Sequence, residues 1–168
     1  MAELLVVDYQ PDWPAQYAQV AAELVSILAG PGVVLEHIGS TAVPGLCAKP
    51  VLDIALGVAA LAVVEARIDA LGERGFTYRP GYESEIPDRR YFVRPAGPLP
   101  RVHLHAVVVG GTLWRQHLGF RDALREDPGL AQSYAGLKRD LAVVHASDKA
   151  AYTEAKAPFI RQVLAARR

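Results

Sequence analysis

The chain has 168 residues, and its 18 Lys and Arg balance its 18 Asp and Glu, so its formal net charge is zero. A hydrophobic share of 51% with only 21% charged residues predicts a folded protein rather than a disordered one. The balanced charge gives no electrostatic basis for general nucleic-acid or membrane-surface binding. The single cysteine, Cys47, excludes an internal disulfide and a multi-cysteine zinc site. No secretion signal or long apolar run is present, so we expect a cytoplasmic protein.

Hydrophobic spacing and turn residues predict an α+β chain whose last third is helical. The expected elements in chain order are a strand at 4–7, a helix from Asp12 that stops at 30–32, strands at 33–38 and 51–58, a helix at 61–71, short strands at 76–79 and 90–94, a strand at 101–109, and helices at 112–126, 128–145 and 148–166. A segment rich in Gly and Pro, 39–50, separates the strands at 33–38 and 51–58. The pattern predicts a small mixed sheet flanked by helices.

Two features between positions 39 and 53 point to chemistry. Gly39-Ser40 ends a strand, where backbone N–H groups and a hydroxyl can meet a phosphate that a larger side chain would hold away. Asp53 interrupts an apolar strand, and a buried carboxylate costs several kcal/mol unless it is hydrogen-bonded, paired or bound to a cation. The plain alternatives are a tight turn and a carboxylate that accepts backbone hydrogen bonds.

Histidines supply a second candidate group. His103 and His105 are two positions apart, so an extended strand would project both imidazoles from one face, where they could bind a divalent transition metal or exchange protons. A polar patch is the alternative. Glu36 and His37 precede the Gly-Ser turn, and one of them must face the same cleft. The remaining histidines, at 117 and 145, lie in predicted helices and are expected to be surface or packing residues.

Basic and aromatic residues in the middle of the chain could bind an anionic, ring-containing ligand. The basic candidates for phosphate contacts are Lys49, Arg89, Arg90, Arg94, Arg101, Arg115 and Arg121. Lys49 is the strongest of these, because two prolines stiffen its loop and Asp53 is close in sequence. Tyr82 and Tyr91 could stack on a base. The alternative for the arginines is ordinary solvation.

The segment from Glu36 to Leu46, Glu-His-Ile-Gly-Ser-Thr-Ala-Val-Pro-Gly-Leu, together with Ala48 to Ile54, resembles the signature of the GrpB family. The similarity continues through His103-Leu104-His105 into the C-terminal third. That family is regarded as a branch of the nucleotidyltransferase superfamily, which has a DNA polymerase β-like fold. The resemblance implies one nucleotidyltransferase-like domain over 1–168, with its helical part at about 112–168.

The resemblance also implies a site. Active nucleotidyltransferases place a Gly-Ser turn before a strand with two alternate acids, which hold two magnesium ions with a third acid. Gly39-Ser40 and Asp53 match this pattern, but Ala55 stands where the second acid belongs. We therefore expect a nucleotide or another phosphorylated small molecule as ligand, and a divalent cation, Mg or a transition metal. A nucleotidyltransferase, a catalytically degenerate binding module and a histidine-based hydrolytic metal site all remain open.

These expectations assign roles to individual residues. The expected catalytic residues are Asp53, His103 and His105, the expected ligand-binding residues are His37, Gly39, Ser40, Thr41, Lys49, Arg90 and Arg101, and the expected metal ligands are Asp53, His103, His105 and Glu36. The strands at 51–58 and 101–109 should share a sheet, which would bring Asp53 close to one of the two histidines. An arginine from 89–101 should lie at the rim of the same cleft. Because imidazole suits transition metals better than magnesium, magnesium-dependent nucleotidyl transfer should be weak or absent.

Overall fold

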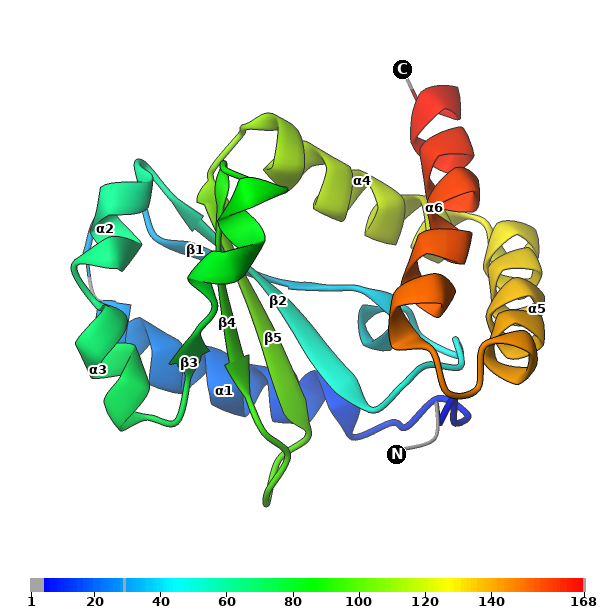
Figure 1. The fold of residues 1–168 in the computed structure, drawn as a ribbon, viewed down its shortest axis with the longest axis horizontal. Helices are drawn as coiled ribbons and strands as arrows, with labels where there is room; N and C mark the ends of the chain where they lie inside the picture. The colour runs from blue at the N-terminus through cyan, green and yellow to red at the C-terminus, as the bar shows by residue number, and fades with distance from the viewer. Residues whose placement is uncertain (1–4, 29, 168) are drawn as a thin grey trace.

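A five-stranded mixed sheet forms the centre of the molecule. The computed structural model describes residues 5–28 and 30–167 (Figure 1). The strands are β1 (Val34–Ile38), β2 (Val51–Val58), β3 (Thr77–Tyr78), β4 (Arg89–Arg94) and β5 (Arg101–Val108). Their order in the sheet is β1-β2-β5-β4-β3, and β2 pairs with β5 in parallel while the other neighbours are antiparallel. The strands expected at 51–58 and 101–109 thus lie side by side, and the expected α+β class is confirmed.

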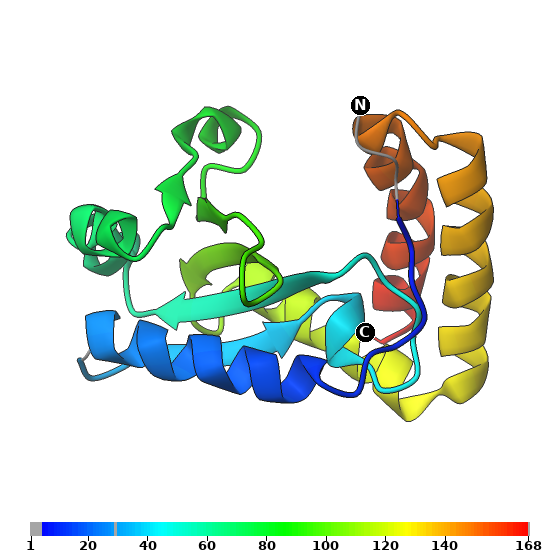
Figure 2. The same cartoon turned by 90° about the horizontal axis from the view of Figure 1, so that it is seen from below.

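Helices lie on both faces of this sheet and beyond its end. They are α1 (Trp13–Leu28), α2 (Leu61–Glu65), α3 (Ile68–Glu73), α4 (Thr112–Glu126), α5 (Pro128–Val144) and α6 (Lys149–Ala166), with short 3-10 turns η1 (Ser40–Ala42) and η2 (Pro80–Ser84). Figure 2 shows α1 along one face of the sheet, with α5 and α6 standing together beyond its end. Within the described residues, no helix combines the length and apolar character needed to cross a membrane.

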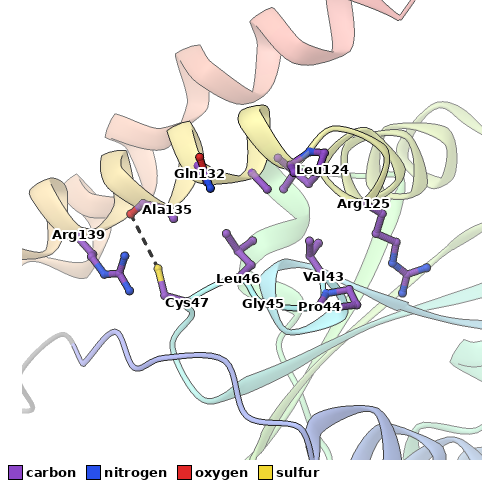
Figure 3. Close-up of a pocket in the computed structure, with 12 residues that line it drawn as sticks. Val43, Pro44, Gly45, Leu46, Cys47, Leu124, Arg125, Gln132, Ala135 and Arg139 are labelled. Atoms are coloured by element: carbon purple, nitrogen blue, oxygen red, sulfur yellow. Dashed lines mark hydrogen bonds between the residues drawn. The ribbon is translucent and has the colours of Figure 1, made fainter.

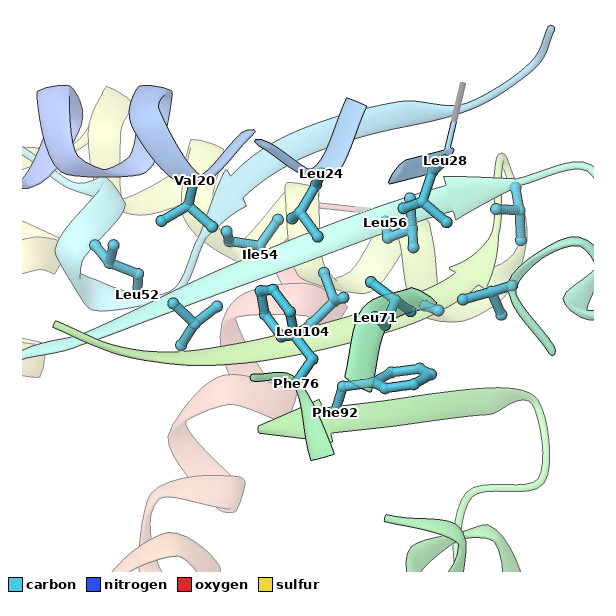
Figure 4. Close-up of a cluster of buried hydrophobic side chains, with 14 of the residues drawn as sticks. Val20, Leu24, Leu28, Leu52, Ile54, Leu56, Leu71, Phe76, Phe92 and Leu104 are labelled. Carbon is cyan, nitrogen blue, oxygen red and sulfur yellow. The ribbon is translucent and has the colours of Figure 1, made fainter. Parts of the chain in front are cut away.

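The alternation of side chains along β2 separates the core from the polar face. Leu52, Ile54 and Leu56 are fully buried and pack against α1 and against the α2–α3 segment in the main core (Figure 4). The intervening residues, which include Asp53 and Ala55, project from the opposite face. At one end of that second face, Trp114 of α4 covers Ala55 in a smaller apolar cluster. The other end, around Asp53, is lined largely by polar and charged side chains.

Two expected elements differ from the structure. The helix expected at 61–71 is divided into α2 and α3, because the backbone tightens where Arg67 N–H donates to Val64 O, three residues back. Part of the strand expected at 4–7 lies outside the described residues, and in the rest only Val7 pairs, in a single bridge with Ala48. A ladder from this bridge would next need the N–H of residue 50, and Pro50 has none.

Close packing of α4 on the sheet generates a test of the fold. A Cβ at Gly57 of β2 would lie 2.7 Å from Cζ3 of Trp114, so Gly57→Ala should lower the free energy of unfolding by about 1–3 kcal/mol through overpacking. A Cβ at Gly136 of α5 would meet no atom within 4 Å, so Gly136→Ala should raise the free energy of unfolding by about 0.5–1 kcal/mol. Urea denaturation measures both, and equal effects would contradict this packing.

Candidate functional site

A cleft of about 490 Å³ opens on the Asp53 face of the sheet. Its walls come from the η1–β2 segment, β5, the η2–β4 segment, α5 and α6, and Figure 2 shows β2 running between the helical pair and the segment that contains η2. The lining residues are Ser40, Thr41, Ala48, Lys49, Val51, Asp53, Tyr82, Glu85, Ile86, Arg89, Tyr91, His103, His105, Lys138, Tyr152, Thr153 and Lys156. Nine residues singled out from the sequence are therefore brought together here: Ser40, Thr41, Lys49, Asp53, Tyr82, Arg89, Tyr91, His103 and His105.

Asp53 lies at the base of the cleft between two imidazoles. Its Oδ1 is 3.0 Å from Nε2 of His105 and 3.6 Å from Nδ1 of His103. The parallel register pairs Asp53 with His103 and Ala55 with His105, which places all three polar side chains on one face. Burial by itself raises the pKa of the Asp53 carboxyl, but the two imidazoles overcome this effect and hold the pKa well below its usual range. Asp53 therefore carries a full negative charge at neutral pH.

Gly39 directly follows β1 and lies against the carboxylate of Asp53. Its φ of +72° with a ψ of −174° is a combination that is essentially restricted to glycine. A Cβ at this position would lie 2.7 Å from Oδ2 of Asp53. Gly39 was expected to let a ligand approach the backbone, whereas in the structure its missing side chain makes room for the Asp53 carboxylate.

Arginines border the histidines. Arg89 lines the cleft: its Nη1 is 3.4 Å from Nδ1 of His105, and its guanidinium lies 4.7 Å from the centre of the Tyr91 ring. Its Nε is buried and has no hydrogen-bond partner among the described residues, and burial lowers the pKa of the guanidinium. Arg101 is exposed at the start of β5, where its Nε donates to Nε2 of His103 at 3.1 Å.

Arg90 was expected to bind the ligand, and the structure places it elsewhere. Because side chains alternate along β4, Arg89 faces the cleft and Arg90 faces the opposite side, where its Nε donates to Glu65 at 2.7 Å. Arg89 is thus the arginine from 89–101 that lines the cleft.

Three lysines converge on the opposite wall. Lys138 of α5 donates to Ser40 Oγ at 2.8 Å and to the carbonyl of Cys47. Lys49 and Lys156 lie 4.1 and 4.5 Å from the centre of the Tyr152 ring. Burial lowers the pKa of Lys138 to about 7 and, with repulsion from Lys156, that of Lys49 to about 8. Burial lowers the pKa of Lys156 as well.

Lys138 and Lys156 were missed in the sequence. Both lie in the C-terminal helices, where each follows a buried tyrosine by four positions: Tyr134 precedes Lys138, and Tyr152 precedes Lys156. Residues four positions apart lie on the same face of a helix. A lysine four positions after a buried tyrosine is therefore on the helix face that packs against the rest of the protein. Each ammonium lies against its own tyrosine ring, at 4.8 and 4.5 Å.

Glu36 and His37 do not line the cleft. Glu36 lies on the Asp53 face, but its Oε2 accepts from Nη1 of Arg121 at 2.5 Å. His37 faces α1, where it stacks on Tyr17 and its Nε2 is 2.9 Å from Thr41 Oγ1. Burial lowers the pKa of His37 to about 4, so it is neutral. The expected roles of Glu36 as a metal ligand and His37 as a ligand-binding residue have no support in these positions.

His117 was expected to be a surface or packing residue, and its position is closer to the site. Its ring centre lies 5.2 Å from that of His105, and burial lowers its pKa to about 4. His117 therefore packs against His105 as a neutral imidazole ring.

A second hollow of about 520 Å³ lies between the Val43–Cys47 segment and helices α4 and α5 (Figure 3). Its walls are largely apolar. Its two arginines are engaged: Arg125 donates to the carbonyl of Ala42, and Arg139 pairs with Asp8. The cations that line the cleft beside Asp53, by contrast, have no carboxylate partner among the described residues.

The expected metal ligands are not arranged around a common point. Among residues 5–28 and 30–167, no three or more His, Cys, Asp and Glu side chains are grouped so that they could hold a metal ion. Both imidazoles are directed at the same oxygen of Asp53, and each has an arginine at its other nitrogen. The donor set does not fit a resident divalent cation in this geometry, and cation binding stays a prediction.

The contact of Gly39 with Asp53 gives a test of the site's construction. Gly39→Ala should lower the free energy of unfolding by at least about 1 kcal/mol more than Gly45→Ala. Both glycines have positive φ, +72° and +80°, but a Cβ at Gly45 meets nothing within 4 Å. Chemical denaturation measures the difference, and equal losses would show that the carboxylate does not depend on this close approach.

Comparisons with known proteins agree with the motif. The family model described as GrpB protein matches residues 3–166. A UPF0157 protein of Halalkalibacterium halodurans is 32% identical over 163 residues, which are 97% of this chain and 82% of that protein. A dephospho-CoA kinase of Mycolicibacterium paratuberculosis is 28% identical over 182 residues, covering 95% of this chain and 45% of the kinase. The crystal structure of the conserved protein GrpB from Enterococcus faecalis superposes with a TM-score of 0.84 at 34% identity and covers 95% of this chain and 94% of that one. The chain belongs to the GrpB family.

Proposed function

We propose that this chain binds a phosphorylated small molecule, a nucleotide or a compound of similar size, in the cleft beside Asp53. Ser40, Lys49, Lys138 and Arg89 contact the phosphates. The observation that carries this proposal is a set of buried or partly buried cations that line an open cavity without a carboxylate partner.

The charge distribution of the cleft supports an anionic ligand. Its lining contains four cations, Lys49, Arg89, Lys138 and Lys156, against two carboxylates, Asp53 and Glu85. None of the four cations lies within ion-pair distance of a carboxylate of the described residues. Removing an ammonium or guanidinium from water costs free energy that only an opposite charge or several hydrogen bonds recover. A phosphate offers both.

The dimensions and the opposite wall support a ligand larger than inorganic phosphate. A volume near 490 Å³ lies within the range of about 300–1,000 Å³ that is usual for small-molecule sites. Tyr82 is half exposed and meets Tyr91 edge to face, with ring centres 5.4 Å apart. An exposed ring on this wall of the cleft offers a stacking surface for a base, while Lys138 and Lys156 line the opposite wall.

The surroundings of Ala55 support binding without two-metal catalysis. Ala55 is fully buried in the apolar cluster that Trp114 covers, so a carboxylate at this position would have to be placed in an apolar environment. Position 55, where the nucleotidyltransferase pattern has its second acid, therefore holds no carboxylate in this chain. A transferase with a different acid set is the alternative, and magnesium-dependent release of pyrophosphate distinguishes it from a binding module.

Isothermal titration of the purified chain with ATP, CTP, inorganic pyrophosphate and dephospho-CoA tests the proposal; the last is included because of the name of the mycobacterial relative. At least one compound should bind, and Lys138→Gln should weaken it about tenfold or more, since a charge-assisted contact is lost. Arg161→Gln is the control, because Arg161 is exposed and does not line the cleft. If no compound binds, or both variants bind alike, the proposal is wrong.

Binding should depend on pH through the two lysines whose pKa is lowered. In the free chain Lys138 and Lys49, with pKa values of about 7 and 8, lose protons as pH rises past neutrality. Lys156, Lys149 and Arg139 repel these ammonium groups and Asp53 attracts Lys49, whereas a bound phosphate would raise both pKa values. Affinity should therefore fall by up to about tenfold per pH unit for each of the two lysines above roughly pH 7.5, with uptake of protons on binding.

Titration calorimetry in buffers of different ionisation enthalpy measures this proton uptake. Lys138→Gln should reduce the uptake, since one of the two titrating groups is then absent. An affinity that does not change across this pH range would show that neither lysine titrates against the ligand.

A further inference from the structure

Each histidine beside Asp53 connects the carboxylate to an arginine. His105 has Nε2 at 3.0 Å from Asp53 Oδ1 and Nδ1 at 3.4 Å from Nη1 of Arg89. His103 has Nδ1 at 3.6 Å from the same oxygen, and its Nε2 accepts from Nε of Arg101 at 3.1 Å. His105 thus links the carboxylate to one guanidinium by hydrogen-bond contacts, and His103, at the longer distance of 3.6 Å, lies between the same oxygen and a second guanidinium.

The donors and acceptors in these contacts determine where the protons lie. A carboxylate can only accept and a guanidinium can only donate. The nitrogen of each imidazole that faces Asp53 therefore carries a proton, and the nitrogen that faces the arginine presents a lone pair. In this arrangement His105 carries its proton on Nε2 and His103 carries its proton on Nδ1, so each ring has a single N–H.

A metal ion at Asp53 is incompatible with this arrangement. To coordinate a cation beside the carboxylate, each imidazole would need its lone pair on the nitrogen that now carries a proton. The proton would then lie on the opposite nitrogen, directed at an N–H of Arg89 or Arg101. The two guanidinium groups would also add their positive charge close to the cation.

We propose that Asp53 in this chain positions two arginines through His103 and His105, and that Arg89 and Arg101 replace divalent metal ions as the countercharge for the ligand's phosphates. This inference rests on the proposed function. It assigns Asp53, His103 and His105 as positioning residues rather than as metal ligands.

The position of Arg89 favours this role. Its Nη1 is held by His105 and its plane by the ring of Tyr91, while its buried Nε has no partner among the described residues. A guanidinium fixed at one edge presents its remaining N–H groups in a planar fork, which matches two oxygens of a phosphate. Arg101, exposed at the start of β5, adds a second positive charge beside His103, which lines the cleft.

The first experiment separates this inference from the proposed function. ATP and inorganic pyrophosphate are titrated into the chain in EDTA and then with magnesium, manganese or zinc. We expect binding in EDTA, and a gain of no more than about twofold with any metal. Binding that requires a metal would overturn this inference and leave the proposed function intact. Absence of binding under every condition would overturn both.

The second experiment tests the connection between His105 and Arg89 with a double-mutant cycle for ATP or pyrophosphate binding in EDTA. If His105 acts through Arg89, His105→Ala should weaken binding about tenfold in the unsubstituted chain and less than about twofold in an Arg89→Ala background. His105→Gln should largely retain binding, because its amide can donate to Asp53 and accept from Arg89. Arg161→Ala, at an exposed position of α6, is the control.

Three results would overturn the positioning role: equal losses for His105→Ala in both backgrounds, a His105→Gln variant as weak as His105→Ala, or a loss that appears only when metal is present. Urea denaturation of each variant identifies losses that come from unfolding. A variant that does not fold is replaced by the corresponding change in the second pair, His103→Ala or His103→Gln with Arg101→Ala, for which the same pattern is expected.

Discussion

The parallel pairing of β2 with β5 is the constraint on which both the core and the cleft depend. Its register sets Asp53 beside His103 and Ala55 beside His105. Because side chains alternate, the same pairing aligns Leu52 and Ile54 with apolar residues of β5 on the face that α1 covers. A shift by one residue would bury the charged groups and expose the core, so the hydrophobic effect that folds the sheet also fixes the polar site.

The cationic wall of the cleft carries a cost in stability. Lys138 and Lys156 lie on helices α5 and α6 beyond the end of the sheet, and burial disfavours the charged form of each lysine. In the window between the folded pKa of Lys138, about 7, and its higher unfolded pKa, the unfolded chain binds more protons, so this lysine makes the fold more stable as pH rises. Such a penalty in stability agrees with the proposal that these lysines serve a ligand rather than the fold.

The distribution of acids and bases distinguishes this site from a two-metal centre. Asp53 is the single carboxylate of its strand, Ala55 lies under Trp114, and Glu36 is engaged with Arg121. Positive charge comes instead from lysines of α5 and α6 and from arginines of β4 and β5. The chain therefore keeps the Gly-Ser turn and the strand aspartate, while the other charged groups that line the cleft are mostly cations of the protein itself.

Local patterns in the sequence were sufficient to determine most elements and part of the site. The strand at 51–58, the three C-terminal helices and the shared face of His103 and His105 follow from side-chain periodicity and from turn residues, which are properties of neighbours along the chain. The closeness of Asp53 to the histidines was expected from the resemblance to the family fold and is confirmed.

Only the tertiary structure decided which basic residues lie close to Asp53 and the two histidines. Lys138 is 98 positions from Ser40, and Arg89 rather than Arg90 faces the cleft because of the register in which β4 pairs with β5. Contacts between residues so far apart depend on how helices and strands pack, and the spacing of residues within one element does not contain that information.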